Sequence, residues 1–81
     1  MNHKDALDVV KESIAAVIPG ADLAALGPED NFRDALEMDS LDFLSFIETL
    51  SERTGIRIDD EDTTQLTTLS GSAGFLVVRT A

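Results

Sequence analysis

Apolar residues near the start of the chain recur in steps of three and four, which is the spacing of one face of an α-helix. The stretch covers residues 5–18, with Asn2 as a cap and Asp5 in the first turn. Pro19 and Gly20 end it, because proline cannot donate to the helix ladder and clashes with the preceding turn. The pattern predicts an amphipathic helix with the apolar positions Leu7, Val10, Ile14, Val17 and Ile18.

A second helical pattern covers residues 40–53, in the middle of the chain. Asp39 is the expected cap, Asp42 lies in the first turn, and Gly55 stops the helix. The predicted buried stripe consists of Phe43, Phe46, Ile47 and Leu50.

The opposite side of this second helix combines apolar and acidic positions. At about 100° per residue, that side carries Leu41, Leu44, Glu48 and Glu52. We therefore expect two partly exposed leucines close to Ser40, and their position suggests a docking face.

Residues 21–38, between the two helices, form the longest irregular piece, with a possible helical turn at residues 22–26. Loops longer than about 12 to 15 residues are uncommon in compact domains unless they are functional. The apolar residues expected to hold this loop against the core are Leu23, Leu26, Phe32 and Leu36.

The last third of the chain predicts a connector and two further helices. Ile56 and Ile58 belong to a short extended connector, and the four acids of residues 59–62 begin a short, weak helix. Ser70 is the expected cap of the last helix, which carries Ala73, Phe75, Leu76 and Val77. Gly71 and Gly74 each cost about 1 kcal/mol relative to alanine, so we expect this helix to be the least stable.

These elements predict an all-α fold with three main helices, one short helix and a long first loop. A chain of 81 residues has room for one core, so residues 1–81 are expected to form a single domain. No apolar run approaches the roughly 18 residues of a membrane-spanning helix, and the start of the chain lacks a signal-peptide pattern. We expect a cytoplasmic protein.

Charge and composition narrow the class of partner. Sixteen acids against six bases give a net charge of −10, which argues against nucleic acid and against anionic membrane surfaces. Basic protein surfaces are the natural partners. The absence of cysteine excludes disulfides, thiolate metal sites and thiol catalysis by the polypeptide.

Catalytic and metal sites are hard to assemble from these residues. The single histidine, His3, lies in an end of the chain that is expected to fray, so a Ser/His/Asp arrangement with Ser40 is not expected. The acids of residues 59–62 do not continue as a calcium loop, because Thr64 and Ser70 stand at the sixth and twelfth positions. We therefore predict no catalytic residue and no metal site.

The hydroxyl of Ser40 has surroundings that suit an attached phosphate ester. The free N–H groups and positive end of a helix favour an anion there. Serine and aspartate are also the ordinary start signals of helices, and by residue type alone that simpler interpretation would be favoured.

The tetrapeptide Asp39-Ser40-Leu41-Asp42 resembles the signature of acyl carrier proteins. Phe32 and Leu36 match the family's Phe-x-x-x-Leu spacing ahead of the serine. Farther along, Ile56-Arg57-Ile58, the following acids and Leu66-Thr67-Thr68-Leu69 match the family's segments after it. The resemblance covers nearly the whole chain and implies a small four-helix bundle with 4'-phosphopantetheine attached to Ser40.

The resemblance also implies partners. A phosphopantetheinyl transferase would attach the arm from coenzyme A, and an acyl ligase, ketosynthase or acyltransferase with a basic docking patch would use the cargo. The protein would be a carrier and not an enzyme, most simply a monomer, in fatty-acid, polyketide or specialised lipid biosynthesis. The docking positions it implies are Asp39, Leu41, Asp42, Leu44, Glu48 and Glu52.

Two other interpretations stay open from the sequence. Peptidyl or aminoacyl carriers share the serine but usually show Gly-Gly-His-Ser or Gly-Gly-Asp-Ser, whereas Glu37 and Met38 precede Asp39 here. An acidic, non-catalytic interaction protein would explain the charge and leave the Ser40 hydroxyl without a function.

Three residues of the second helix depart from the usual pattern of bacterial fatty-acid carriers, namely Ser45, Glu48 and Ser51. These departures put recognition by the housekeeping synthase in doubt.

Overall fold

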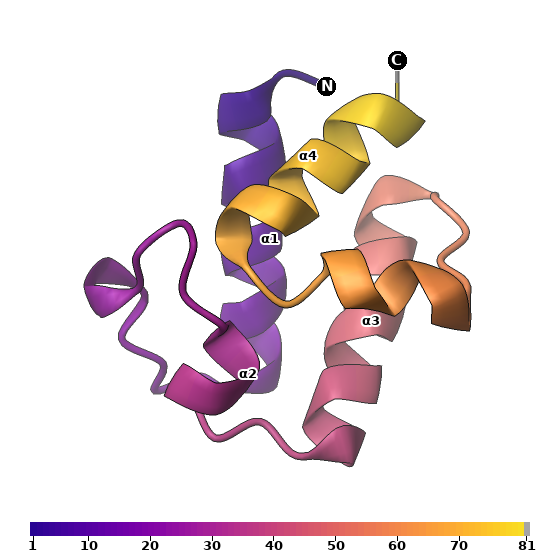
Figure 1. Ribbon diagram of the computed structural model, residues 1–81. Coiled ribbons are helices and arrows are strands. Elements are labelled where there is room, and N and C mark those ends of the chain that lie inside the picture. Colours follow the sequence, from indigo (N-terminus) through magenta and orange to yellow (C-terminus); the bar gives the residue numbers. More distant parts are fainter. Residues whose placement is uncertain (81) are drawn as a thin grey trace.

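The computed structural model describes residues 1–80, which fold into an all-helical structure (Figure 1). The long helices are α1 (His3–Val17), α3 (Ser40–Thr54) and α4 (Leu69–Arg79). The short ones are η1 (Leu23–Ala25), α2 (Phe32–Ala35) and η2 (Asp60–Gln65), of which η1 and η2 are 3-10 helices. The prediction of an all-α fold with three main helices is confirmed. Across residues 1–80, no helix has the length and apolar character needed to cross a membrane.

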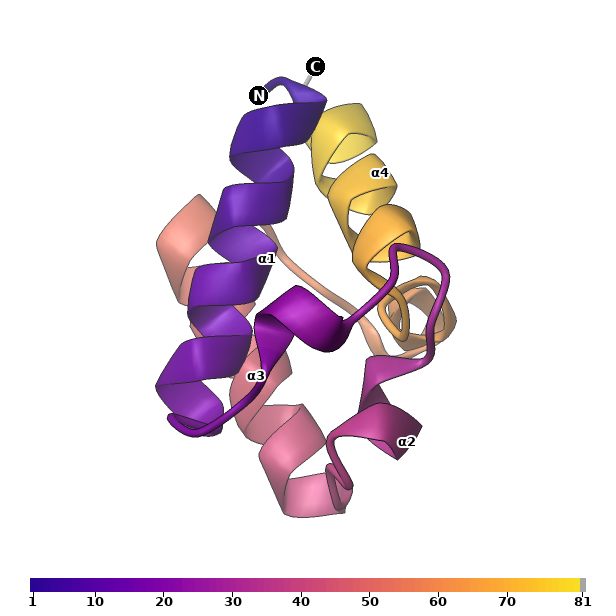
Figure 2. The same ribbon diagram turned by 90° about the vertical axis from the view of Figure 1, so that its left-hand side faces the viewer.

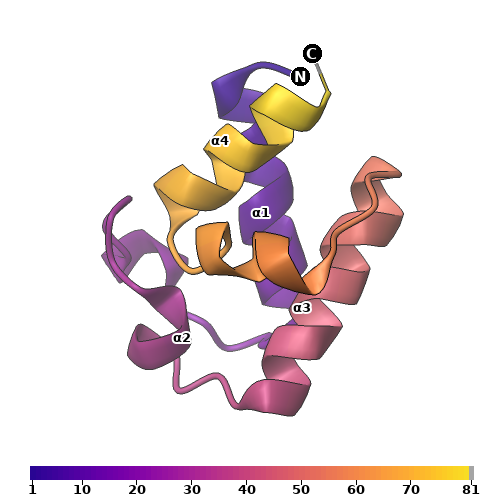
Figure 3. The same cartoon turned by 45° about the vertical axis from the view of Figure 1, so that its right-hand side comes forward.

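Helix α1 is the centre of the packing, since it contacts both α3 and α4. Both of those helices run back along α1 in the opposite direction, as Figures 1 and 2 show. Figure 3 shows η2 between α3 and α4, and Figure 1 shows η1 on the opposite side of α1. The core between the helices contains the fully buried side chains Val10, Ile14, Phe32, Phe46, Leu50, Leu66 and Leu76.

The first and third helices form where the pattern predicted them. Asn2 caps α1 by accepting a hydrogen bond from the Asp5 amide at 2.8 Å. Asp39 caps α3, and Gly55 ends it in the left-handed conformation with φ of 70°. Helix α1 begins at His3, directly after the predicted cap, with Asp5 in its first turn. Local periodicity and local caps were sufficient for these two helices.

The long loop is held down as expected and contains a helical turn that was not predicted. Phe32 is fully buried, whereas Leu23, Leu26 and Leu36 are partly buried against the core. The turn is α2, in which the amides of Arg33 and Asp34 donate to the Asn31 side chain. The Phe32 amide also donates to the Thr67 carbonyl at 2.9 Å, so a distant segment stabilises the start of α2.

The predicted cap of the last helix was wrong. Thr68 is the cap, because its hydroxyl accepts a hydrogen bond from the Gly71 amide at 2.9 Å. Ser70 lies inside α4, and its amide donates to the Pro28 carbonyl at 2.9 Å. Both residue types cap helices well. Leu69 is buried, at 3% exposure, and together with the contact between Ser70 and Pro28 it fixes the start of α4 against the rest of the fold.

Candidate functional site

Ser40 is the first residue of α3, and its side chain is exposed. The cap is provided by Asp39, whose carboxylate accepts from the Asp42 amide at 2.8 Å and whose carbonyl accepts from the Phe43 amide at 2.9 Å. Within residues 1–80, the Ser40 hydroxyl and the amides of Ser40 and Leu41 make no hydrogen bond to a protein group. The hydroxyl is therefore not used for capping and remains free for chemistry.

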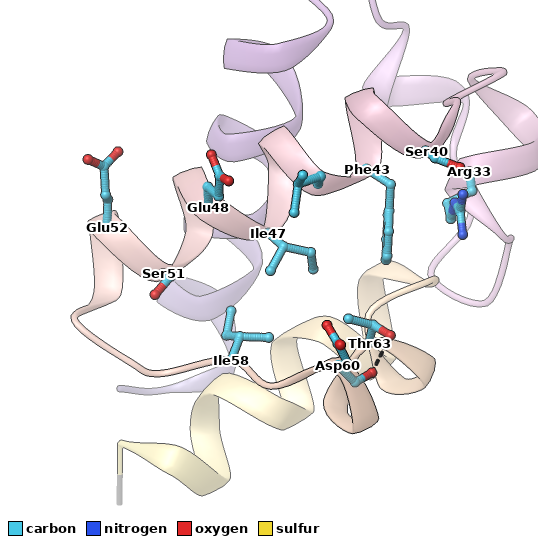
Figure 4. A pocket seen from close by; sticks show the side chains of 11 residues that line it. Arg33, Ser40, Phe43, Ile47, Glu48, Ser51, Glu52, Ile58, Asp60 and Thr63 are labelled. Carbon is cyan, nitrogen blue, oxygen red and sulfur yellow. Dashed lines mark hydrogen bonds between the residues drawn. The ribbon is translucent and has the colours of Figure 1, made fainter.

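An open groove of about 880 Å³ lies beside Ser40, between α3 and the segment that contains η2. Figure 4 shows Phe43, Ile47 and Ile58 pointing into the space between these elements. Polar groups surround this apolar centre. The complete lining is Arg33, Ser40, Phe43, Leu44, Ile47, Glu48, Ser51, Glu52, Ile58, Asp60 and Thr63.

Arg33 reaches this site from α2. Its guanidinium carbon lies 4.2 Å from the centre of the Phe43 ring, in the geometry of a cation–π contact. Figure 4 places the Arg33 side chain next to Ser40, at one end of the groove. A positive charge thus lines the same groove as the free hydroxyl, in a chain whose net charge is −10.

The predicted docking positions lie mostly on the surface. Leu41 is 74% exposed and Leu44 is 52% exposed, which confirms that both leucines face solvent. Of the four acidic docking positions, Asp39, Glu48 and Glu52 are exposed and Asp42 is partly buried. Leu44, Glu48 and Glu52 also border the groove. The docking role of these residues stays a prediction.

Sequence reasoning did not connect Arg33, Asp60 or Thr63 with Ser40. These residues reach the groove on α2 and η2, and only tertiary packing brings those elements to α3. One signal was available for Arg33, because it is the only basic residue between Lys11 and Arg53.

Comparisons with known proteins point to one family. Residues 8–76 match the family described as "Phosphopantetheine attachment site". The chain is 35% identical to the acyl carrier protein of Rubrobacter xylanophilus over 77 residues, which cover 95% of this chain and 94% of that protein. It is 33% identical to the acyl carrier protein of Thermosynechococcus vestitus over 76 residues, covering 94% of this chain and 93% of the relative.

The start of α3 fits a prosthetic group joined through a phosphate ester. A free hydroxyl is available for the ester, two unpaired amides can donate to the phosphate, and the groove can lie along an extended arm. The chain therefore belongs to the acyl carrier proteins, which hold their cargo on a covalently attached 4'-phosphopantetheine and are modified by enzymes without being catalysts themselves.

Proposed function

We propose that 4'-phosphopantetheine is attached to Ser40 and that the chain presents acyl thioesters on this arm to biosynthetic enzymes. The observation that carries the proposal is the exposed Ser40 hydroxyl, left free by the Asp39 cap and placed beside an apolar groove. An ordinary helix-start serine would be expected to accept from an amide of the first turn. Asp39 already has that role, which supports a different use for Ser40.

The residues around Ser40 indicate what an enzyme must add. Within residues 1–80, no histidine or carboxylate forms a hydrogen bond with the Ser40 hydroxyl, so the transferase has to supply the base. The Ser40 oxygen would attack the phosphorus atom next to the pantetheine arm and give up its proton to the base of the transferase. The pyrophosphate bond of coenzyme A would break, and adenosine 3',5'-bisphosphate would leave. When attached, the arm supplies the thiol that this cysteine-free chain lacks. The chain contributes position and a high local concentration of the cargo.

We also propose that partner enzymes bind the exposed side of α3 through the docking surface formed by Asp39, Leu41, Asp42, Leu44, Glu48 and Glu52. Acids at the rim increase the rate of encounter with a basic patch, and exposed apolar side chains hold the docked pose. The partners would be a phosphopantetheinyl transferase and then an acyl ligase, ketosynthase or acyltransferase. In this proposal the carrier acts as a monomer.

The attachment is tested by intact mass. The apo protein is incubated with coenzyme A, a divalent cation and a broad-specificity phosphopantetheinyl transferase. We expect one phosphopantetheine on the unchanged chain and none on Ser40→Ala. Ser45→Ala is the matched control, since Ser45 is an exposed serine of the same helix, and it should be modified fully. An adduct on Ser40→Ala, or none on the folded unchanged chain, would refute the proposal.

The docking surface is tested with two exposed apolar residues of equal exposure. Leu41 is 74% exposed on α3 and Val78 is 73% exposed on α4. We expect Leu41→Ser to raise the KM of the transferase about tenfold, which corresponds to about 1.4 kcal/mol. Val78→Ser should leave the KM unchanged. Equal KM values for both variants would show that the exposed side of α3 is not the surface that the transferase reads.

A further inference from the structure

Arg33 differs from most basic residues of the chain in having no acidic partner. Ion pairs within 4.0 Å join Lys4 to Asp8, Arg53 to Glu12, Arg57 to Asp59 and Arg79 to Asp62. Within residues 1–80, Arg33 and Lys11 form no ion pair. Sixteen acids are available to balance six bases, so an unpaired arginine beside the proposed attachment serine calls for an explanation.

The position of Arg33 is held at both its backbone and its side chain. Its amide donates to the Asn31 side chain at 3.0 Å, and its carbonyl accepts from the Met38 amide at 2.8 Å. The second bond ties Arg33 to the residue two positions before Ser40. The guanidinium rests on the ring of Phe43, which comes three residues after Ser40 and therefore lies on the same side of α3.

This geometry leaves the guanidinium with free donors. A guanidinium that stacks on a ring uses its flat face, while its N–H groups point outward in the plane and can bind two oxygens of a carboxylate or phosphate. The protein offers no such acid to Arg33 within residues 1–80. The free N–H groups of Arg33 are suited to an anion with paired oxygens in the groove that Arg33 and Ser40 both line.

We propose that Arg33 is a positioning residue that binds the phosphodiester between Ser40 and the prosthetic arm. This inference rests on the proposed attachment at Ser40. The unpaired amides of Ser40 and Leu41 can donate to the same phosphate. With the phosphate held beside Phe43, the rest of the arm starts along the groove and does not swing freely into solvent.

The negative net charge of the chain gives the contact between Arg33 and the phosphodiester an effect on stability. A new phosphodiester adds negative charge to a surface that is already strongly acidic, and like charges oppose one another. Arg33 offsets this repulsion at the point of attachment. Because the phosphate would bind Arg33 and the two free amides only in the folded protein, attachment of the arm should raise the melting temperature of the unchanged protein. It should fail to do so when the guanidinium is removed.

The test compares apo and holo forms of the unchanged chain, Arg33→Met, Arg33→Lys and Lys11→Met. Lys11→Met is the matched control, because Lys11 is the other base without an acidic partner and lies on α1. Intact mass first establishes complete modification of each protein. Three quantities are then measured: the melting temperature, the ³¹P chemical shift of the phosphodiester, and the ¹H–¹⁵N signal of the Arg33 Nε–H group in the unchanged chain.

We expect attachment to raise the melting temperature of the unchanged chain and of Lys11→Met by about 4 °C. In Arg33→Met the gain should be lost and the ³¹P shift should change, whereas Arg33→Lys should keep part of both effects. The Arg33 Nε–H signal should move between apo and holo forms, a readout that needs no variant.

Two results overturn the inference in distinguishable ways. If the unchanged chain is not modified at Ser40, the proposed function fails and this inference fails with it. If modification is complete but the melting-temperature gain and ³¹P shift are the same in Arg33→Met, and the Arg33 signal does not move, only the phosphate contact is refuted. Arg33 would then serve to pack on Phe43.

Discussion

At two junctions of the molecule an arginine lies over a phenylalanine ring, but within the described residues only one of these arginines has an acidic partner. At the junction of α2 and α3, Arg33 lies 4.2 Å above the ring of Phe43. At the junction of η2 and α4, Arg79 lies 4.6 Å above the ring of Phe75 and also donates to Asp62 at 2.9 Å. The first arginine has no acidic partner within residues 1–80, whereas the second has a buried one.

Two hydrogen bonds meet at the Asp62 side chain, one from the start of η2 and one from α4. The Asp62 side chain is only 8% exposed, and it accepts from the Asp59 amide at 3.0 Å as well as from Arg79. The junction of α2 and α3 ends in an open groove with a free hydroxyl and free amides. Arg79 is thus held by the fold, whereas the guanidinium of Arg33 keeps free N–H groups at the edge of the groove.

The largest expected effect is at Asp62, whose removal should break the closed junction. Asp62→Ala takes away the Arg79 ion pair and leaves the Asp59 amide without its acceptor. Removing one partner of a buried ion pair costs about 3–5 kcal/mol. Because Arg79 is 42% exposed and can be rehydrated, we expect the free energy of unfolding in urea to fall by about 2–3 kcal/mol.

The control for Asp62 is an exposed ion pair of the same residue classes. Asp8→Ala breaks the contact between Lys4 and Asp8, whose side chains are 83% and 54% exposed. It should cost about 0.5 kcal/mol or less. Asp62→Asn keeps an acceptor for the Asp59 amide and should fall between these values. Equal losses for Asp62→Ala and Asp8→Ala would show that the junction of η2 and α4 is not closed by this pair.

The second effect concerns Gly71, at the start of α4. A β-carbon there would lie 2.7 Å from the Gln65 carbonyl oxygen and 2.9 Å from the Thr68 hydroxyl that caps the helix. Since a backbone oxygen must move to make room, Gly71→Ala should lower the free energy of unfolding by about 1–2 kcal/mol. Urea denaturation measures this loss. A gain in stability would mean that η2 and α4 are less closely packed than the structure indicates.

The third effect has the opposite sign and uses the other glycine of the same helix. A β-carbon at Gly74 would meet nothing within 4 Å. Gly74→Ala should therefore raise the free energy of unfolding by about 0.5–1 kcal/mol, through the better helix propensity of alanine. Both glycines were expected to weaken α4, but only Gly74 has room for a β-carbon, whereas Gly71 does not. Similar values for the two variants, measured by urea denaturation, would contradict this distinction.

The smallest effect is expected for Arg33 in the apo protein. Arg33→Met keeps an apolar chain over Phe43 and loses only the cation–π attraction, so the free energy of unfolding should change by about 0.5 kcal/mol or less. Arg79→Met leaves the buried Asp62 carboxylate without its cation and should cost about 2 kcal/mol or more. If both variants lost a similar free energy of unfolding in urea, the two arginines would not differ in their contribution to stability.

Much of the helical framework was predictable, because its signals are local. The periodicity and caps of α1 and α3 lie within those segments, at Asn2, Asp39 and Gly55. The cap of α4 was not predictable from residue type, since Thr68 and Ser70 can both cap a helix. Ser70 instead donates its amide to the Pro28 carbonyl, a contact that only the tertiary structure supplies. Helix α2 was missed because four residues carry no clear periodicity, and its start depends on the Thr67 carbonyl.

The sequence by itself determined the helical class, the strongly acidic surface and the position of Ser40 at a helix start, because composition, periodicity and a capping motif are local properties of the chain. Only the tertiary structure decided which side chains surround Ser40. Arg33 and Thr63 come to it on separate elements, and burial of Phe32 and Leu66 in one core holds those elements in place. The physical reason is that side chains distant in sequence acquire their neighbours through core packing, which no local pattern records.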